Sequence, residues 1–287
     1  MRAAGGDGIP SEVNPRVLLA EWGTRPKKKF GQNFLLDSGA SRRIAQVACE
    51  GISTDTRLLE IGAGTGALTL ALLEAGANVT ALEIDPQLVS ILGNRADLAR
   101  ATIVLGDAMT YDYGAFARGG SWRVAGNLPY NIATPLLVGL AEMEGGPETI
   151  VAMIQKDVAD RISAKPGTAA YGSLSVALQY AMHAERAFTL GPRAFYPPPK
   201  VDSTVIRLTR RTEPAVHPRD LELFRKVVRG AFAYRRKTLA NSLALALHIE
   251  RDAIARAIAA SDLPAESRGE QLDLQAFCRL ADALAER

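Results

Sequence analysis

The chain has 287 residues, of which 47% are hydrophobic and 23% are charged, and its formal net charge is +3. These fractions are typical of a folded protein and exclude a largely disordered chain. The sequence contains no stretch of about 18 apolar residues, so we expect no membrane span. The length predicts one large domain and one smaller domain.

The cysteines and histidines argue against a disulfide framework and against a metal site. Cys49 and Cys278 are far apart in the sequence and form no C-x-x-C pair. His183, His217 and His248 are scattered, so we predict no metal centre. Reduced cysteines, together with an N-terminus that lacks an apolar core, predict a cytosolic protein.

The first half of the chain predicts an α/β fold. Residues 1–24 are rich in Gly, Ala and turn formers, and we expect a flexible extension with a short helix at 16–22. Apolar residues at helical spacing then predict a helix at 37–50. Strands are predicted at 57–61, 78–84, 101–105, 124–126 and 149–155, and helices at 67–75, 86–98, 134–142 and 156–163. This alternation favours a parallel sheet that has helices on both faces.

The second half changes character after residue 171. We predict a helix at 174–180, a strand at 186–190 and a strand at 205–209 with the short alternation of an antiparallel edge. Three prolines at 197–199 exclude a helix or a central strand between these two strands. A polar break at 210–218 predicts a linker, and the rest of the chain is predicted to be helical. The predicted division is therefore 1–24, 25–212 and 213–287.

A glycine cluster between the first strand and its helix predicts a nucleotide-like ligand. Gly62, Gly64 and Gly66 permit a tight turn in which a ligand lies against the backbone at the N-terminus of a helix. Glu83 ends the next strand, where a carboxylate can accept both hydroxyl hydrogens of a ribose. Gly62, Gly64 and Ala67 also satisfy the dinucleotide pattern, so the loop leaves NAD and S-adenosylmethionine open.

Asp107 follows the third strand, in the run Leu-Gly-Asp-Ala. An acid at that height can contact the adenine amino group of a cofactor that lies across the strand ends. An aspartate in this position is equally typical of a turn or a helix cap.

The run Asn127-Leu128-Pro129-Tyr130 at the end of the fourth strand is the most specific motif. Pro129 has no N–H and a fixed φ, so the carbonyl of Leu128 can point into a cleft. The Asn127 side-chain oxygen and this carbonyl can accept the two hydrogens of an exocyclic amino group, whose lone pair then faces a methyl donor. Tyr130 can stack on a flipped base. The motif indicates methyl transfer to a nucleobase.

Basic side chains gather in two places on a nearly neutral chain. Residues 25–29 read Arg-Pro-Lys-Lys-Lys, and residues 219–237 contain seven basic side chains against two acids. Such runs form either solvated faces or a track for a polyanion.

These motifs, taken together, resemble those of the small-subunit ribosomal RNA adenine dimethyltransferase family (KsgA). The matching segments lie at 28–35, 60–66, 127–135, 195–203 and 231–243, so the resemblance runs from about residue 25 to the C-terminus. It implies a Rossmann-like class I methyltransferase sheet of seven strands with a small all-helical C-terminal domain. Residues 25–212 would form the catalytic domain, and residues 213–287 would bind RNA or the ribosome.

The resemblance also implies the activity and the site. The cofactor is S-adenosylmethionine, its product is S-adenosylhomocysteine, and two adjacent adenosines near the 3′ end of 16S ribosomal RNA become N(6),N(6)-dimethyladenosines. The partner is 16S rRNA in the 30S subunit or its assembly precursor, bound by a monomer. The cofactor-binding positions fall on Gln32, Asn33, Leu35, Gly62, Gly64, Glu83, Ile84, Asp107, Ala108 and Asn127. The target base sits between Tyr130 and Phe195, beside Asn127, Leu128 and Pro129, and the RNA-binding positions are Lys27, Lys28, Lys29, Arg235, Arg236 and Lys237.

Three other functions compete with this prediction. A methyltransferase of the erythromycin-resistance type uses the same chemistry on large-subunit RNA, although the segment at 231–243 favours the small-subunit enzyme. A non-catalytic RNA-binding factor on the same scaffold disagrees with the intact Glu83, Asp107 and Asn127. An NAD-dependent dehydrogenase leaves residues 127–130 and the three prolines unexplained.

Overall fold

The computed structural model describes residues 14–234 and 236–286. The chain divides into two compact units. Among the described residues, the first unit contains those up to Ala133, Pro147–Gln155 and Ala187–Val205, and the second contains Thr134–Gly146, Lys156–Arg186 and those from Ile206 onward. The predicted boundary at residue 213 lies within the second unit, and the predicted domain division stays a prediction. The expectation for residues 1–13 falls outside the described residues.

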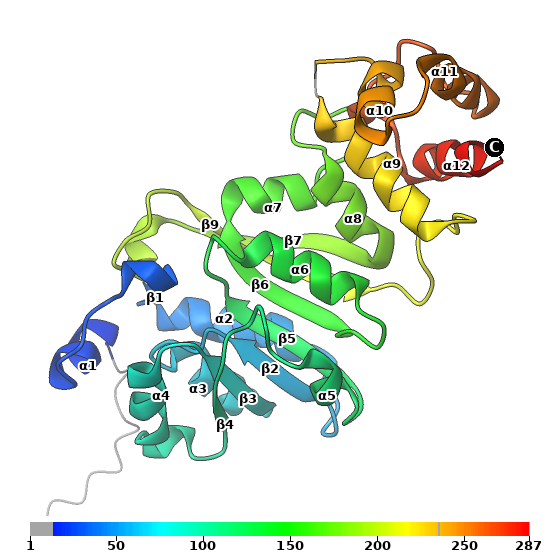
Figure 1. Cartoon of the computed structure of the whole chain (residues 1–287). Helices are drawn as coiled ribbons and strands as arrows, with labels where there is room; N and C mark the ends of the chain where they lie inside the picture. The colour runs from blue at the N-terminus through cyan, green and yellow to red at the C-terminus, as the bar shows by residue number, and fades with distance from the viewer. Residues whose placement is uncertain (1–13, 235, 287) are drawn as a thin grey trace, which may run out of the picture. The chain divides into compact units, whose positions relative to one another are not determined.

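Seven strands form one sheet in the order β4-β3-β2-β5-β6-β9-β7 (Figure 1). Their bounds are β2 Arg57–Ile61, β3 Asn78–Glu83, β4 Thr102–Leu105, β5 Trp122–Asn127, β6 Thr149–Gln155, β7 Met182–Leu190 and β9 Ser203–Arg210. The pairs β2–β3, β2–β5, β3–β4 and β5–β6 are parallel. The strand order reverses at β2, which lies between β3 and β5. Ligands of such sheets bind outside the carboxyl ends of the strands at this reversal.

The helices fill the connections between the strands and make up most of the C-terminal region. In the first unit they are α1 Pro15–Glu21, α2 Ser38–Cys49, α3 Ala67–Glu74, α4 Pro86–Gly93 and α5 Tyr113–Ala117. The remaining helices are α6 Ala133–Glu142, α7 Lys156–Ile162, α8 Ser173–Ala181, α9 Leu221–Ala233, α10 Leu239–Leu247, α11 Arg251–Ala260 and α12 Leu274–Ala285. Short 3-10 turns lie at η1 Lys28–Phe30, η2 Ala96–Leu98, η3 Pro192–Ala194 and η4 Gly269–Gln271. Asp37, Asp85, Asp112, Asp220 and Asp273 cap the N-termini of α2, α4, α5, α9 and α12.

The core of the first unit holds the glycine loop at the sheet. Ile44 of α2 and Leu72 of α3 are fully buried in one cluster with Leu58 of β2, Val79 of β3 and Val151 of β6. Burying each such side chain contributes about 1.5–3 kcal/mol. The apolar side chains whose spacing predicted these two helices therefore form the surface by which α2 and α3 pack on the sheet.

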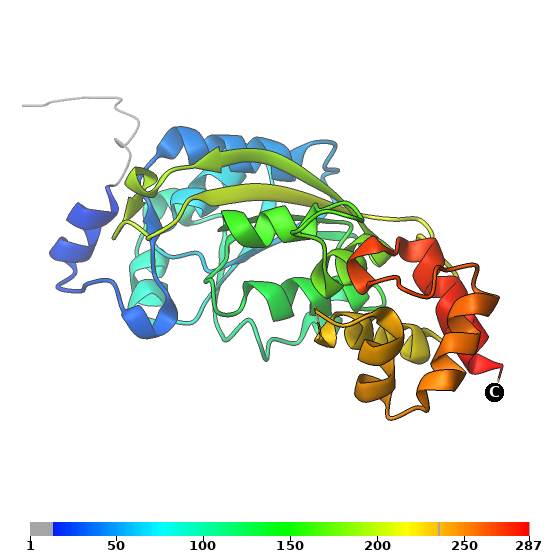
Figure 2. The same cartoon turned by 90° about the horizontal axis from the view of Figure 1, so that it is seen from above.

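The second unit has a core of its own. Phe224 and Val228 on α9 pack in one cluster with Leu243 on α10, Ile258 on α11 and Phe277 on α12. These helices, yellow to red in Figure 2, lie against one another at the C-terminal end of the chain. The predicted helical C-terminal region is confirmed.

Two predictions about individual elements were wrong. The strand predicted as an edge at 205–209 is β9, which lies between β6 and β7, so β7 forms the edge. Consistently, four successive residues at the start of β9 are buried, from Ser203 to Ile206. The helix predicted at 86–98 ends at Gly93, because the capping Asn94 and the 3-10 turn η2 follow it.

The sequence patterns also missed three short elements. These are α5 and the two-residue strands β1 Phe34–Leu35 and β8 Phe195–Tyr196, which pair with each other in antiparallel fashion. Two residues are too few to show a periodicity. The pairing brings the segment after the lysines next to the segment before the three prolines.

Candidate functional site

The loop after β2 needs glycine at positions where a side chain has no room. Gly62, Gly64 and Gly66 all have positive φ, at 76°, 60° and 84°. A Cβ on Gly64 would lie 3.1 Å from the ring of Phe34, and one on Gly66 would lie 2.7 Å from the side chain of Leu98. Gly66 precedes α3, so this backbone leads directly to the N-terminus of that helix.

Glu83 joins the end of β3 to the glycine loop. Its Oε2 accepts a hydrogen bond from the backbone N–H of Gly64 at 2.8 Å, and its Oε1 accepts one from the backbone N–H of Asp85 at 3.0 Å. The side chain is 4% exposed, and burial raises the pKa of Glu83 above its usual range. Each carboxylate oxygen has a further lone pair, so the group can still accept two hydroxyl hydrogens.

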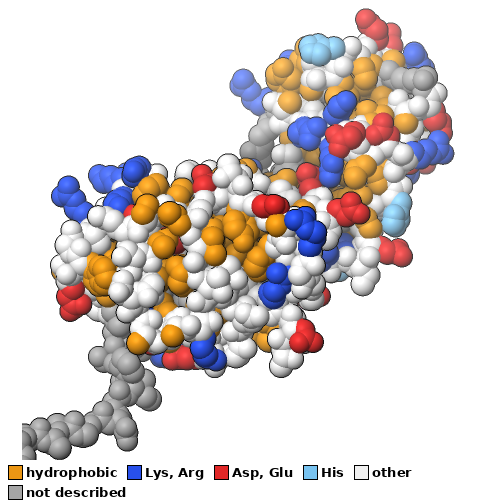
Figure 3. Space-filling model, turned by 60° about the horizontal axis from the view of Figure 1, so that its bottom comes forward, with side chains coloured by type: hydrophobic (Ala, Val, Ile, Leu, Met, Phe, Trp, Pro, Cys, Tyr) orange, Lys and Arg blue, Asp and Glu red, His pale blue; other side chains and the backbone are white. Residues whose placement is uncertain are grey.

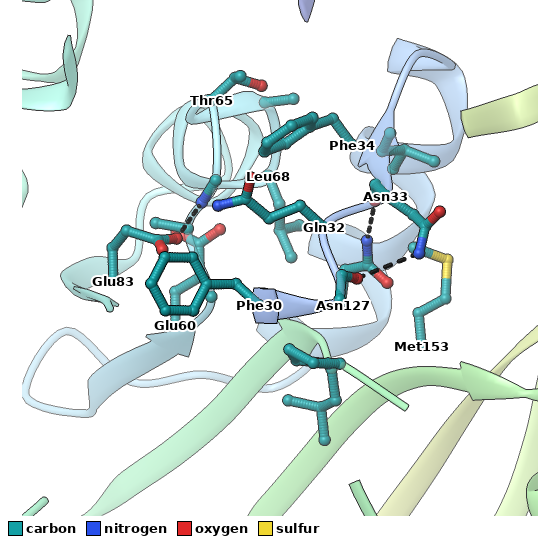
Figure 4. Close-up of a pocket in the computed structure, with 18 of the residues that line it drawn as sticks. Phe30, Gln32, Asn33, Phe34, Glu60, Thr65, Leu68, Glu83, Asn127 and Met153 are labelled. Carbon is teal, nitrogen blue, oxygen red and sulfur yellow. Dashed lines mark hydrogen bonds between the residues drawn. The ribbon is translucent and has the colours of Figure 1, made fainter. Parts of the chain in front are cut away.

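Gly126 brings the end of β5 close to the end of β2. A Cβ at this position would lie 2.5 Å from the carbonyl oxygen of Ile61. The next residue, Asn127, donates its Nδ2 hydrogen to the carbonyl oxygen of Asn33 at 2.8 Å. This bond identifies the other side-chain atom as the oxygen, and leaves it as an acceptor. Figure 4 shows Asn127 and Glu83 at opposite sides of the same pocket.

Two features of the next residues keep an acceptor available beside Asn127. The N–H of Leu128 donates to the carbonyl oxygen of Met153 at 3.1 Å, which anchors the motif to β6. Pro129 restricts the backbone of Leu128 to extended conformations, which limits the directions that the Leu128 carbonyl can take. The hydroxyl of Tyr130 is 3.2 Å from the Oγ of Ser203, so the ring is held at the far end of the motif.

Asp85 fixes the segment that carries Asn33. Its carboxylate accepts hydrogen bonds from the Nζ of Lys27 at 2.7 Å and from the Nε2 of Gln32 at 3.1 Å. The Oε1 of Gln32 accepts the backbone N–H of Lys27 at 2.8 Å, which closes a ring of contacts. Burial opposes the charge of Asp85, but these hydrogen bonds and that from Gln87 hold its pKa below the usual range.

A second buried acid lines the same pocket. Glu60 is 1% exposed, and its Oε2 has no hydrogen-bond partner among the described residues. Burial raises the pKa of Glu60 to about 8, and the neighbouring Glu83 adds to the rise. None of the described residues that line this pocket is Lys or Arg. The site is therefore built for a ligand that is cationic or rich in N–H and O–H donors.

The pocket, a cavity of about 90 Å³, unites most of the predicted site residues (Figure 4). It is lined by Gln32, Asn33, Leu35, Gly62, Gly64, Glu83, Ile84, Asn127, Leu128, Pro129 and Tyr130. The sequence patterns assigned no role to Phe30, Phe34, Glu60 or Met153, which also line it. Glu60 is an acid inside the apolar run Leu58–Ile61, and this placement is the sequence feature that could have identified it as a site residue.

Three predicted site residues do not line the pocket. Phe195 is 1% exposed and belongs to the core cluster that contains Leu35. Asp107 is exposed, and its Oδ1 accepts the N–H of Met109 at 2.8 Å, which is the turn geometry that the sequence left open. Ala108 is buried beside it.

The predicted RNA-binding cations fall into two groups. Lys27 is paired with Asp85, whereas Lys28, Lys29, Arg236 and Lys237 are exposed. Arg235 lies outside the described residues. On the face drawn in Figure 3, Lys and Arg side chains form small groups with acids and uncharged surface between them.

Two further features are absent from the part of the chain that the structure describes. The described ranges contain no group of three or more His, Cys, Asp and Glu side chains placed to hold a metal ion. Among the helices that the structure describes, none is long and apolar enough to cross a membrane.

Comparison with protein families and curated proteins agrees with this geometry. The model of a family described as "Ribosomal RNA adenine dimethylase" matches residues 23–282. A ribosomal RNA small subunit methyltransferase A from Pseudomonas aeruginosa is 45% identical over 266 residues, which are 91% of this chain and 96% of that protein. The protein of the same name from Geobacillus thermodenitrificans is 42% identical over 285 residues, covering 96% of this chain and 97% of that protein.

Solved structures show the same fold. The crystal structure of the 23S rRNA methyltransferase ErmE matches with a TM-score of 0.68 and 26% identity, over 88% of this chain and 100% of that one. A dimethyladenosine transferase from Plasmodium falciparum matches with a TM-score of 0.70 and 24% identity, over 86% and 95% of the two chains. The predicted fold class is confirmed.

Proposed function

Because the chain belongs to the ribosomal RNA adenine dimethylase family, we propose that it dimethylates two adjacent adenosines in the hairpin near the 3′ end of 16S rRNA. The substrate is the 30S subunit or its assembly precursor, the reaction is a late step of assembly, and the enzyme acts in the cytoplasm as a monomer. The hydrogen bond from Asn127 to the carbonyl of Asn33 carries this proposal, since it leaves the Asn127 oxygen as an acceptor.

The pocket residues fit S-adenosylmethionine better than NAD. A dinucleotide carries an anionic pyrophosphate, whereas the described lining contains two buried acids and no Lys or Arg. Burial disfavours the charged forms of Glu60 and Glu83, so a cationic ligand, which would offset that cost, fits the pocket better than an anionic pyrophosphate. When bound, S-adenosylmethionine supplies an electrophilic methyl group on a sulfonium. Glu83 would hold the ribose hydroxyls, and the glycine loop would lie along the ligand.

The last residue of β5 and the three residues that follow it act on the base. The Asn127 oxygen and the Leu128 carbonyl accept the two amino hydrogens, which favours a pyramidal nitrogen with an available lone pair. Tyr130 stacks on the extruded ring. Held in this way, the nitrogen would accept the methyl group that the cofactor supplies and would then lose a proton to solvent. In the second transfer one hydrogen remains, so one acceptor suffices to orient it.

The small-subunit assignment rests on the relatives. Proteins that are 42–45% identical over most of this chain are named for the small subunit, whereas the 23S rRNA methyltransferase is 26% identical. The exposed Lys28, Lys29, Arg236 and Lys237 are proposed to hold RNA phosphates while the pocket selects the base. The helical region 213–287 is proposed as the ribosome-binding part.

Methyl transfer from labelled S-adenosylmethionine to 30S particles that lack the modification tests the proposal. We expect two labelled methyl groups on each of two adjacent adenosines, located by primer extension. Mature 30S particles and large subunits serve as controls and should stay unlabelled. Labelling of large-subunit RNA, or of neither RNA, would overturn the assignment.

A further inference from the structure

The second unit contains a cavity of about 250 Å³ that shares no lining residue with the glycine-loop pocket. All of its lining residues belong to that unit. They come mainly from α6, α8 and α9, and on α6 they are Thr134, Val138 and Glu142, which recur at the spacing of one helix face. The cavity is therefore a product of helix packing rather than of one loop.

The wall of this cavity is apolar and carries an aromatic ring. Leu174, Phe224 and Val228 are at most 4% exposed. The ring of Tyr180 is half-buried and packs on Phe224 with their centroids 5.5 Å apart and their planes inclined by 39°. A planar group can stack on the face of this ring.

The rim of the cavity is positively charged. Arg225 is already paired, with its Nε 3.2 Å from Glu142 and its Nη1 2.6 Å from Glu222. Arg161 and Arg229 are exposed, and neither has an ion pair with another described residue. Two unpaired guanidinium groups beside an aromatic wall are complementary to the phosphates and the ring of a nucleotide.

We propose that this cavity binds an unpaired nucleobase of the RNA substrate other than the methylated adenosines. Tyr180, supported by Phe224, stacks on the base, while Arg161 and Arg229 contact the flanking phosphates. The inference rests on the proposed function, because it assigns a second contact with the same RNA. Such a contact increases affinity for the particle without taking part in methyl transfer.

Two sets of variants test the site. Arg161→Ala with Arg229→Ala is matched by Arg256→Ala with Arg268→Ala, which removes the same charge from exposed positions outside the cavity. Tyr180→Leu is matched by Tyr180→Phe, which keeps the ring. The readouts are the Kd of a labelled single-stranded RNA at several salt concentrations, the KM for 30S particles, and the Kd of S-adenosylmethionine.

We expect Tyr180→Leu to weaken RNA binding about 5- to 100-fold and Tyr180→Phe to change it little, as for other base–aromatic contacts. The Arg161/Arg229 pair should lower the salt slope by about two and the Arg256/Arg268 pair should not. Cofactor affinity should stay unchanged throughout.

Equal effects of the two arginine pairs, or unchanged RNA binding in Tyr180→Leu, would refute the nucleobase site. If Tyr180→Leu unfolds, the arginine pairs decide alone. A defect in 30S binding without one in RNA binding would instead indicate a protein contact and would also refute it. If the proposed function is wrong, the result is different: the parent protein, without any substitution, would bind RNA but leave 30S particles unmethylated.

Discussion

The side-chain nitrogen of Asn127 donates to the backbone oxygen of Asn33 at 2.8 Å, across 94 positions of sequence. One hydrogen bond thereby orients the amide, because only the nitrogen can donate. The segment that carries Asn33, before α2, thus positions the side-chain oxygen of Asn127 at the end of β5. The amide oxygen remains available as a hydrogen-bond acceptor.

Removing this amide should abolish methyl transfer and leave the fold intact. For Asn127→Ala we expect kcat to fall about 10²- to 10³-fold, the usual effect of losing one positioned polar group in the transition state. Asn94→Ala, at an exposed helix end, is the control and should retain activity. Near-normal turnover of Asn127→Ala would remove this residue from the mechanism.

The pH dependence of stability should report the buried Glu60. Its pKa is raised from 4.5 to about 8 in the folded chain, so the folded state binds more protons than the unfolded state between these values. The stability that this extra proton binding contributes is fully present below pH 4.5 and is lost as the pH rises to about 8. Urea unfolding at several pH values should show that Glu60→Gln gains stability relative to the parent protein as pH rises. A difference that does not vary with pH would contradict the assignment.

We expect Lys27 to contribute to the stability of the fold and the adjacent Lys28 to contribute to RNA binding. Lys27 is ion-paired with Asp85, whose side chain is 2% exposed, whereas Lys28 is exposed. Lys27→Met leaves that carboxylate short of a partner, so we expect a loss of about 1–3 kcal/mol in the free energy of unfolding. Lys28→Met should leave stability unchanged and weaken RNA binding instead. If urea unfolding showed a loss of stability in Lys28→Met and none in Lys27→Met, the Lys27–Asp85 ion pair would not be a stabilising one.

The close approach of β5 to β2 should make Gly126 intolerant of substitution. In Gly126→Ala the new Cβ would lie 2.5 Å from the carbonyl oxygen of Ile61, so the strands must separate. We expect a loss of about 1–3 kcal/mol and a defect in catalysis, because Asn127 moves with the strand. Gly139→Ala is the matched change inside α6, where nothing lies within 4 Å, and should stabilise by about 0.5–1 kcal/mol. Equal stability of the two variants would contradict this geometry.

The basic run at 235–237 should control the salt dependence of binding to the 30S particle. Replacing Arg235, Arg236 and Lys237 with Ala should weaken binding and reduce the magnitude of the salt slope by about 0.7–0.9 for each phosphate that these side chains neutralise. Filter binding at several salt concentrations measures both quantities. An unchanged slope would show that this run faces away from the RNA.

Much of the fold and the catalytic motif was predictable from local patterns. Apolar runs located β2, β3, β4 and β6, and β2 and β6 are buried at nearly every residue, as a strand covered on both faces should be. The glycines of residues 62–66 and the run at 127–130 carry their chemistry in short segments. Their proposed roles follow from residue types at fixed spacing, without knowledge of distant segments.

The tertiary structure decided what depends on residues far apart in the chain. It placed Phe195 in the core rather than in the pocket, paired Lys27 with Asp85 across 58 positions, and set β9 inside the sheet. It also placed Glu60, whose Oε2 has no hydrogen-bond partner among the described residues, in the lining of the pocket. The type of a residue determines which hydrogen bonds its side chain can donate or accept and how much apolar surface it can bury. Only the packing of distant segments determines which partner it meets and how much water surrounds it.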